Sequence, residues 1–172
     1  MRDDAKVSVN DGVAVAARGD AFLIVYQRPA RLHRTQWLFQ QMHAFLGSRT
    51  GSIVALMVVL PSADPPDGPT RAENEAQLRK VGHRLRRLVT APVGDAFRVS
   101  IVRAVMRALA IIQGKAGVHF VCDTIDEGIR RLLESASDDT PSRAELGAML
   151  GALHKALGES YPAAASQRAP LF

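Results

Sequence analysis

An uninterrupted run of eight apolar residues, Ile53 to Leu60, constrains the fold of this chain more than any other feature. It is bounded by Gly51 and Pro61, residue types that interrupt regular structure. A strand without polar positions is buried on both faces of a sheet, so the run predicts a central strand over 52–60. Because the run is far shorter than the ~20 residues that span a bilayer, we expect no membrane insertion.

Four further segments have the patterns of strands. Alternating residues around an Asn-Asp-Gly turn predict a short hairpin or a two-part strand over 7–17. Residues 21–26 are apolar throughout and predict a strand that is buried on both faces for most of its length. Residues 88–93 predict a weaker strand, because Pro92 cannot donate a ladder hydrogen bond and suits an edge or a strand end. The last predicted strand is 118–122.

Apolar residues at helical spacing predict helices between and after these strands. Thr70 and Glu73 have the spacing of a capping box, in which each side chain satisfies a free amide at the start of a helix that follows. Asp123 or Thr124 is expected to cap a later core helix. The predicted helices are 31–46, 71–88, 96–113, 125–133 and 144–160.

This order of segments predicts an α/β fold, with a single mixed sheet of four to five strands on which the helices pack. We expect this domain to cover residues 1–136. A change to serine, aspartate and proline after Glu134 predicts a linker, and an extra amphipathic C-terminal helix completes the segment 137–162. The small and polar residues of 163–172 predict a disordered tail.

Composition places the chain among ordinary globular proteins, since its 172 residues are 47% hydrophobic and 23% charged. Cys122 is the only cysteine, which excludes an intramolecular disulfide and a site of several thiolates and is compatible with a reducing compartment. The first residues lack the apolar stretch of an export signal, so we expect a cytoplasmic protein.

The sequence lacks the motifs of catalysis and cofactor binding. Neither glycine-rich phosphate-binding pattern occurs, and no two histidines have the H-E-x-x-H spacing of a zinc helix. His119 lies three residues before Cys122 on a predicted strand, so the two side chains are expected on opposite faces. We therefore expect no enzymatic activity, cofactor or metal. The carboxylates in predicted loops and helix starts are expected to cap helices: Asp64, Asp67, Asp123, Asp126 and Glu127.

Basic residues are concentrated on the predicted helix 71–88. The six are Arg71, Arg79, Lys80, Arg84, Arg86 and Arg87, against Glu73 and Glu75. Such a face could neutralise phosphates or bind an acidic partner, or it could be a solvated helix face. An aromatic content of only 5% argues against a stacking platform for single-stranded nucleic acid. We take Arg79, Lys80, Arg84 and Arg87 as candidate interaction residues.

The predicted helix 96–113 is apolar around most of its circumference. Such a helix is either buried deeply or docks on something. Its cover could be the helix 144–160 of the same chain or a second chain, and both alternatives stay open. Val102, Met106 and Leu109 are the candidate interface residues.

The order of segments over 7–134 resembles the STAS domain, the fold of sulfate-transporter tails and bacterial anti-sigma factor antagonists. The resemblance is carried by residues 22–26, the run 53–60, the long loop before helix 71–88, and the segment 97–112 before the last strand. It implies a regulatory module whose docking surface is the loop after the central strand and the flanking helices.

Members of the antagonist family carry a phosphorylated hydroxyl in an Asp-Ser-Ser/Thr-Gly segment after the central strand. Here that place is taken by residues 60–65, which lack the preceding aspartate and the glycine. Ser62 and Thr70 are the hydroxyls nearby and the candidate regulatory residues, but the departure from the motif gives no ground to transfer phosphorylation to either.

Our first hypothesis is a non-enzymatic bacterial signalling or scaffold module that binds another protein, and also a second copy of itself, through helices 71–88 and 96–113. The alternative is a nucleic-acid-binding protein that uses the basic face of helix 71–88. A third hypothesis, a small enzyme, would use the proline-rich loop 61–70, whose place at the carboxyl end of a strand suits ligand sites although it has few groups for chemistry.

Overall fold

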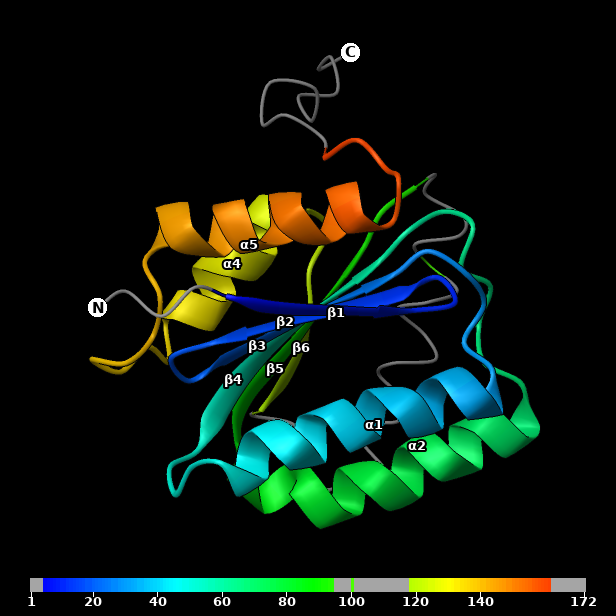
Figure 1. Ribbon diagram of the computed structural model, residues 1–172, viewed down its shortest axis with the longest axis horizontal. Helices are drawn as coiled ribbons and strands as arrows, with labels where there is room; N and C mark the ends of the chain where they lie inside the picture. Colours follow the sequence, from blue (N-terminus) through cyan, green and yellow to red (C-terminus); the bar gives the residue numbers. More distant parts are fainter. Residues whose placement is uncertain (1–4, 95–99, 101–117, 162–172) are drawn as a thin grey trace.

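One mixed sheet of six strands organises the part of the chain that the computed structural model describes, residues 5–94, 100 and 118–161 (Figure 1). The strands lie side by side in the order of the sequence. The first three are antiparallel, and the third to the sixth are parallel. Their bounds are β1 Lys6–Asn10, β2 Val13–Arg18, β3 Ala21–Tyr26, β4 Ile53–Val59, β5 Leu85–Pro92 and β6 His119–Val121.

The N-terminal hairpin forms as its sequence predicts. The turn between β1 and β2 has two central residues with positive φ, Asp11 at 42° and Gly12 at 81°. This is the geometry of a two-residue hairpin turn, in which aspartate and glycine adopt the left-handed conformation at little cost. The number of strands is larger than the four to five that we predicted, because both arms of the hairpin extend the sheet.

The apolar run folds as the interior strand β4, as predicted. It pairs in parallel with β3 on one side and β5 on the other. The first four residues of the strand, Ile53 to Leu56, are completely buried. Two apolar layers on opposite faces of the sheet explain why the sequence has no polar position here.

Helices cover both faces of the sheet. On one face lie α1 (Leu32–Gly47) and α2 (Gly68–Val81), and on the other lie α4 (Ile125–Leu133) and α5 (Arg143–Ala156) (Figure 1). The α/β class is therefore confirmed. The predicted helix 96–113 and its candidate interface residues Val102, Met106 and Leu109 lie outside the described residues. Within the described residues, no helix combines the length and the apolar character that crossing a membrane requires.

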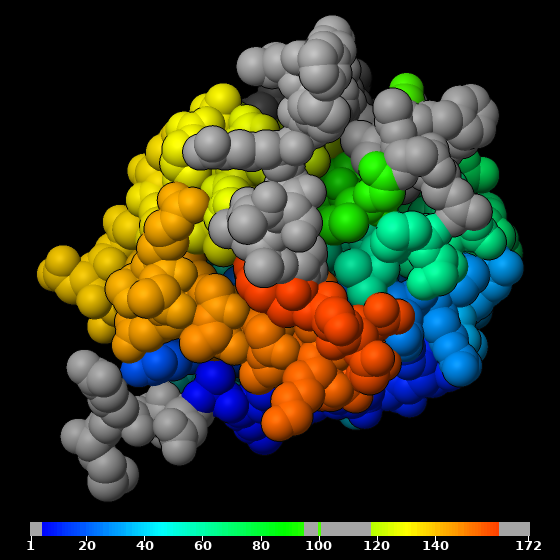
Figure 2. All heavy atoms as spheres, turned by 90° about the horizontal axis from the view of Figure 1, so that it is seen from above, coloured from blue at the N-terminus to red at the C-terminus, as the bar shows by residue number. Residues whose placement is uncertain are grey.

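The C-terminal helix α5 packs directly on the sheet. Figure 2 looks onto its face of the molecule, where α5 lies beside α4. Leu146, Leu150 and Leu153 of α5 have no exposed surface and join the apolar layer of β2 and β3. The helix starts with a complete capping box of Ser142 and Glu145.

The predicted helix 71–88 is wrong in its last part. The helix α2 ends at Val81, a short 3-10 turn follows over Gly82–Arg84, and the next residues form β5. A bulge in β5 explains the misleading pattern, because Ile53 pairs with Leu85 whereas Val54 pairs with Arg87. The extra residue turns Leu85 and Leu88 toward the same apolar layer, a spacing of three that imitates a helix.

The predicted start of α2 is also wrong. Asp67 is the cap, since its Oδ1 accepts a hydrogen bond from the Thr70 amide at 3.0 Å. Pro69 occupies the first turn, where the missing amide hydrogen costs nothing. Thr70 is therefore inside the first turn and completely buried, and Glu73 accepts a hydrogen bond from Gln77.

The strand β5 is interior, between β4 and β6. The sequence allowed Pro92 at an edge strand or at the end of a strand. It lies at a strand end, because it is the last residue of β5. The predicted cap of α4 is confirmed: Thr124 Oγ1 accepts a hydrogen bond from the Glu127 amide at 3.1 Å.

Candidate functional site

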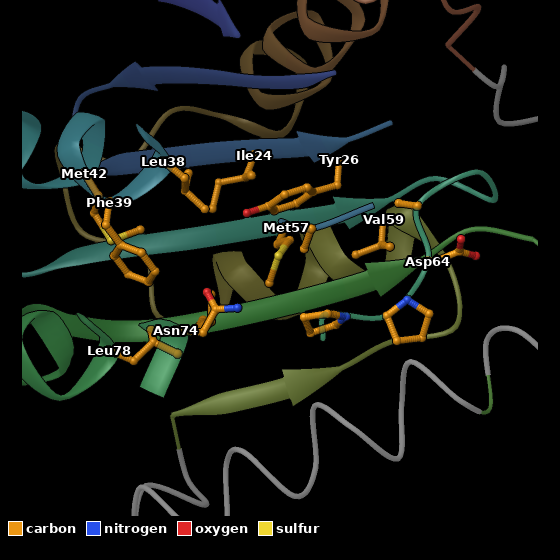
Figure 3. Close-up of a pocket in the computed structure, with 15 residues that line it drawn as sticks. Ile24, Tyr26, Leu38, Phe39, Met42, Met57, Val59, Asp64, Asn74 and Leu78 are labelled. Carbon is orange, nitrogen blue, oxygen red and sulfur yellow. The ribbon is translucent and has the colours of Figure 1, made fainter. Parts of the chain in front are cut away.

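An apolar pocket of about 90 Å³ lies between the sheet and the two helices α1 and α2 (Figure 3). Its floor is formed by Ile24 and Tyr26 of β3 and by Met57 and Val59 of β4. Tyr26 and Val59 are the last residues of their strands. The pocket is therefore at the carboxyl ends of two parallel strands, the place where α/β sheets bind ligands.

The walls of the pocket come from α1, α2, the loop after β4, and Ala30 in the segment before α1. The helix α1 contributes Leu38, Phe39 and Met42, and α2 contributes Leu78. The loop after β4 forms part of the rim with residues 63–66, in which two consecutive prolines fix the backbone. Most of the described residues that line the pocket are apolar, so it favours an apolar group over a polar one.

Three polar side chains lie at the pocket. Asp64 is exposed on the loop, beside Val59, and Asn74 is half-buried on α2, beside Leu78 (Figure 3). Neither has an ion pair or hydrogen bond with another residue in the part of the chain that the structure describes. Burial raises the pKa of the Tyr26 phenol to about 12, against smaller opposing effects of Thr35 and Arg34, so its hydroxyl is uncharged at neutral pH.

The described lining of the pocket has few side chains with catalytic chemistry. Among the described residues that line the pocket there is no serine, cysteine, histidine or lysine. A nucleophile paired with a base, which covalent catalysis requires, is therefore not part of that lining. No group of three His, Cys, Asp or Glu side chains within the described ranges could hold a metal ion.

The volume of the pocket limits its occupant. An engineered apolar cavity of about 150 Å³ holds a benzene molecule, so 90 Å³ suits an aliphatic group smaller than an aromatic ring. Transferring a side chain such as leucine from water into such a site is worth roughly 1.5–3 kcal/mol.

The candidate basic residues do not share one surface. Arg79 and Lys80 are exposed on α2, where Arg79 pairs with Glu75. Arg84 lies on the 3-10 turn and donates hydrogen bonds to the carbonyl oxygens of Gly51 at 2.7 Å and Arg49 at 2.8 Å. These contacts tie the end of α2 to the loop before β4.

Arg87 lies on β5, and its guanidinium carbon is 4.4 Å from the centre of the Phe120 ring. The same guanidinium pairs with Glu134 at 3.2 Å. Arg86, its neighbour, pairs with Asp20. The predicted basic face of one helix is therefore wrong, because the arginines after Val81 belong to other elements and have internal partners.

The two candidate regulatory hydroxyls differ in exposure. Ser62 is exposed on the loop after β4, and its hydroxyl donates a hydrogen bond to the Gln27 carbonyl. Thr70 is completely buried in α2 and could not be modified in the folded protein. Of the two, only Ser62 lies on the surface near the pocket.

Cys122 and His119 do not form a catalytic pair. Cys122 packs in the apolar layer under α4 and α5, and burial raises the pKa of its thiol. His119 Nε2 lies 3.1 Å from the Thr90 hydroxyl, and burial lowers the pKa of the imidazole to about 4. The thiol and the imidazole are therefore both uncharged near pH 7.

Sequence reasoning did not identify the pocket, since its lining runs from Ile24 to Leu88 along the chain. The available signal was the proline-rich loop after the central strand, which pointed to the correct edge of the sheet. Among protein-family models, curated proteins and solved structures, none matches this chain.

Proposed function

We propose that this chain is a non-enzymatic regulatory or scaffold module that docks another protein at the carboxyl edge of its parallel strands. The partner inserts an aliphatic side chain into the pocket between β3, β4, α1 and α2. The observation that carries the proposal is the pocket itself, which is apolar, lined in part by the loop after β4, and about 90 Å³ in volume.

The size and the lining of the pocket favour a side chain of a partner over a free substrate. Sites for drug-sized molecules usually have volumes of roughly 300–1,000 Å³, which is larger than this pocket. A buried aliphatic anchor in a small pocket is instead the usual centre of a protein interface. The residues around the pocket supply few polar groups that could orient a substrate.

The STAS-like order of segments supports the same surface. That resemblance implies docking through the loop after the central strand and the flanking helices. The pocket is lined by this loop and by α1 and α2. Membership of the STAS family remains part of the proposal, and the mixed α/β sheet is compatible with it.

The geometry supports nucleic-acid binding less well. A phosphate-binding face needs several free cations on one surface. Arg84, Arg86 and Arg87 have internal partners, which leaves Arg71, Arg79 and Lys80 as the exposed basic residues on α2. We therefore place protein docking first.

Selection of binders from a displayed library of random peptides tests this function. Ala30 lines the pocket from the segment between β3 and α1, so Ala30→Phe fills it. The matched control is Ala72→Phe, an exposed position of α2 that does not line the pocket. We expect the selected peptides to share an aliphatic residue and to lose at least tenfold in affinity on Ala30→Phe only.

Thermal unfolding of both variants checks that they are folded. If Ala30→Phe does not fold, Leu78→Trp fills the pocket from α2 instead. Peptides that bind the filled variants as tightly as the wild type would reject the pocket as the docking site.

A further inference from the structure

The carboxylate of Asp64 at the rim of the pocket has no cationic partner in the described part of the chain. This is unusual among the carboxylates around it. Asp67, three residues later, pairs with Arg31 at 3.3 Å. Asp11, in the turn between β1 and β2, is contacted by Arg28 at 2.7 Å.

The loop keeps Asp64 away from these cations. It is held between the buried Ala63 and two prolines, so its backbone has little freedom to turn toward Arg31. Figure 3 shows its side chain at the end of the pocket where β4 ends, next to Val59. An apolar cavity and a free negative charge therefore lie side by side.

We propose that the partner segment carries a lysine or arginine close to its aliphatic anchor, with the anchor in the pocket and the cation on Asp64. This inference rests on the proposed function and specifies the chemistry of the partner. In an extended segment, residues two apart point to the same side, so the anchor and the cation are separated by one residue. Asn74 on α2 also lines the pocket, and its side-chain amide, which has no hydrogen-bond partner among the described residues, can serve the main chain of this segment.

Three small probes with the same tail test the two parts of the site separately. They are 3-methylbutylamine, 3-methylbutan-1-ol and 3-methylbutanoate, which share an isobutyl tail and carry a cationic, a neutral and an anionic head group. Each is titrated into the isotope-labelled full chain, and its affinity is read from the amide shifts of residues at the pocket. We expect the amine to bind about two- to fivefold tighter than the alcohol, as an exposed ion pair allows, and the carboxylate to bind weakest.

Asp64→Asn should remove the difference between the amine and the alcohol while the alcohol still binds. The matched control is Asp138→Asn, which removes another exposed carboxylate far along the chain from the pocket and should leave the difference intact. Equal affinity of all three probes for the wild type would overturn the proposed preference for a cation, but it would still agree with the pocket as the site that binds the tail. Failure of every probe to perturb the pocket residues would overturn both.

Three capped peptides then test the source of the ligand: acetyl-Leu-Gly-Lys-amide, acetyl-Leu-Gly-Glu-amide and acetyl-Ala-Gly-Lys-amide. We expect the first to bind tightest, with a loss of about tenfold or more when leucine is replaced by alanine. If the amine binds with the expected preference and the peptides do not bind, the partner-protein assignment is wrong and the site takes a free amine.

Discussion

Arg86 Nη2 lies 2.5 Å from Oδ2 of the buried Asp20, which joins the bulge of β5 to the turn between β2 and β3. The hydroxyl of Ser137 donates to the same oxygen at 2.6 Å. Burial alone would raise the pKa of Asp20, but the hydrogen bonds from Ser137 and Arg86 outweigh it and hold the pKa below its ordinary value. The segment between α4 and α5 is thereby fastened to the sheet.

Gly19→Ala should destabilise the protein through this attachment. Gly19 has a φ of +54°, and a Cβ there would lie 1.9 Å from the Asp139 carbonyl oxygen, so the backbone must shift. The left-handed conformation alone costs alanine about 1–2 kcal/mol, and the clash adds to it. Urea unfolding measures the loss.

Gly158→Ala is the control for the conformational cost alone, because Gly158 has a φ of +73° and open space around its Cβ position. Equal losses in the two variants would show that the contact with Asp139 is not needed for stability.

His119 should make stability depend on pH in the mildly acid range. Its pKa is about 4 in the folded protein, against an ordinary value of 6.5. Below pH 6.5 the His119 imidazole binds a proton in the unfolded chain but stays neutral in the folded protein. The free energy of unfolding therefore falls as the pH drops toward 4. The full effect is up to about 3 kcal/mol.

Unfolding free energies between pH 4 and 7 check this dependence, and His119→Gln should flatten it. The exposed His83 provides the control His83→Gln, which should leave the slope unchanged. A slope that survives His119→Gln would assign the effect to another group.

Leu150→Ala should cost about 2–5 kcal/mol, as for a leucine in a well-packed core. Leu150 of α5 has no exposed surface and belongs to the apolar layer between this helix and the strands β2 and β3. Lys155→Ala, on the exposed side of the same helix, should change stability little. Chemical unfolding of the pair shows whether α5 belongs to the core, and similar small losses in both variants would show that it does not.

Arg84→Ala should destabilise the protein by about 1–3 kcal/mol, because the carbonyl oxygens of Arg49 and Gly51 lose a charged donor. Arg79→Ala should be close to neutral, since its pair with Glu75 lies on the helix surface. The comparison uses chemical unfolding. A larger loss for Arg79→Ala would contradict the structural role of Arg84.

The sequence pattern predicts the fold well where no bulge interrupts the regular alternation or apolar run of a strand. The run from Ile53 to Leu60 predicts β4, and the turn at Asp11 and Gly12 predicts the hairpin. It fails at Leu85 and Leu88, because a bulge puts both on one face of the sheet at a spacing that a helix also produces. A bulge depends on pairing with a distant strand, which a local pattern does not contain.

The candidate site is harder to predict for the same reason. Its floor joins Tyr26 to Val59, residues that meet only because β3 and β4 pair in parallel. The proline-rich loop marks the edge of the sheet in the sequence, but the gap between α1 and α2 depends on how the two helices pack. The predicted basic face is wrong because the predicted helix extends past Val81, where α2 ends.

The methyl groups of the methionines test the central claim, that the pocket accepts an aliphatic group. Met42 and Met57 line the pocket, whereas Met149 packs in the apolar layer on the opposite face of the sheet. In a chain labelled with methyl-¹³C methionine and titrated with 3-methylbutan-1-ol, we expect the signals of Met42 and Met57 to shift together and saturate while that of Met149 stays in place. Unchanged Met42 and Met57 signals, or a larger shift at Met149, would contradict the account.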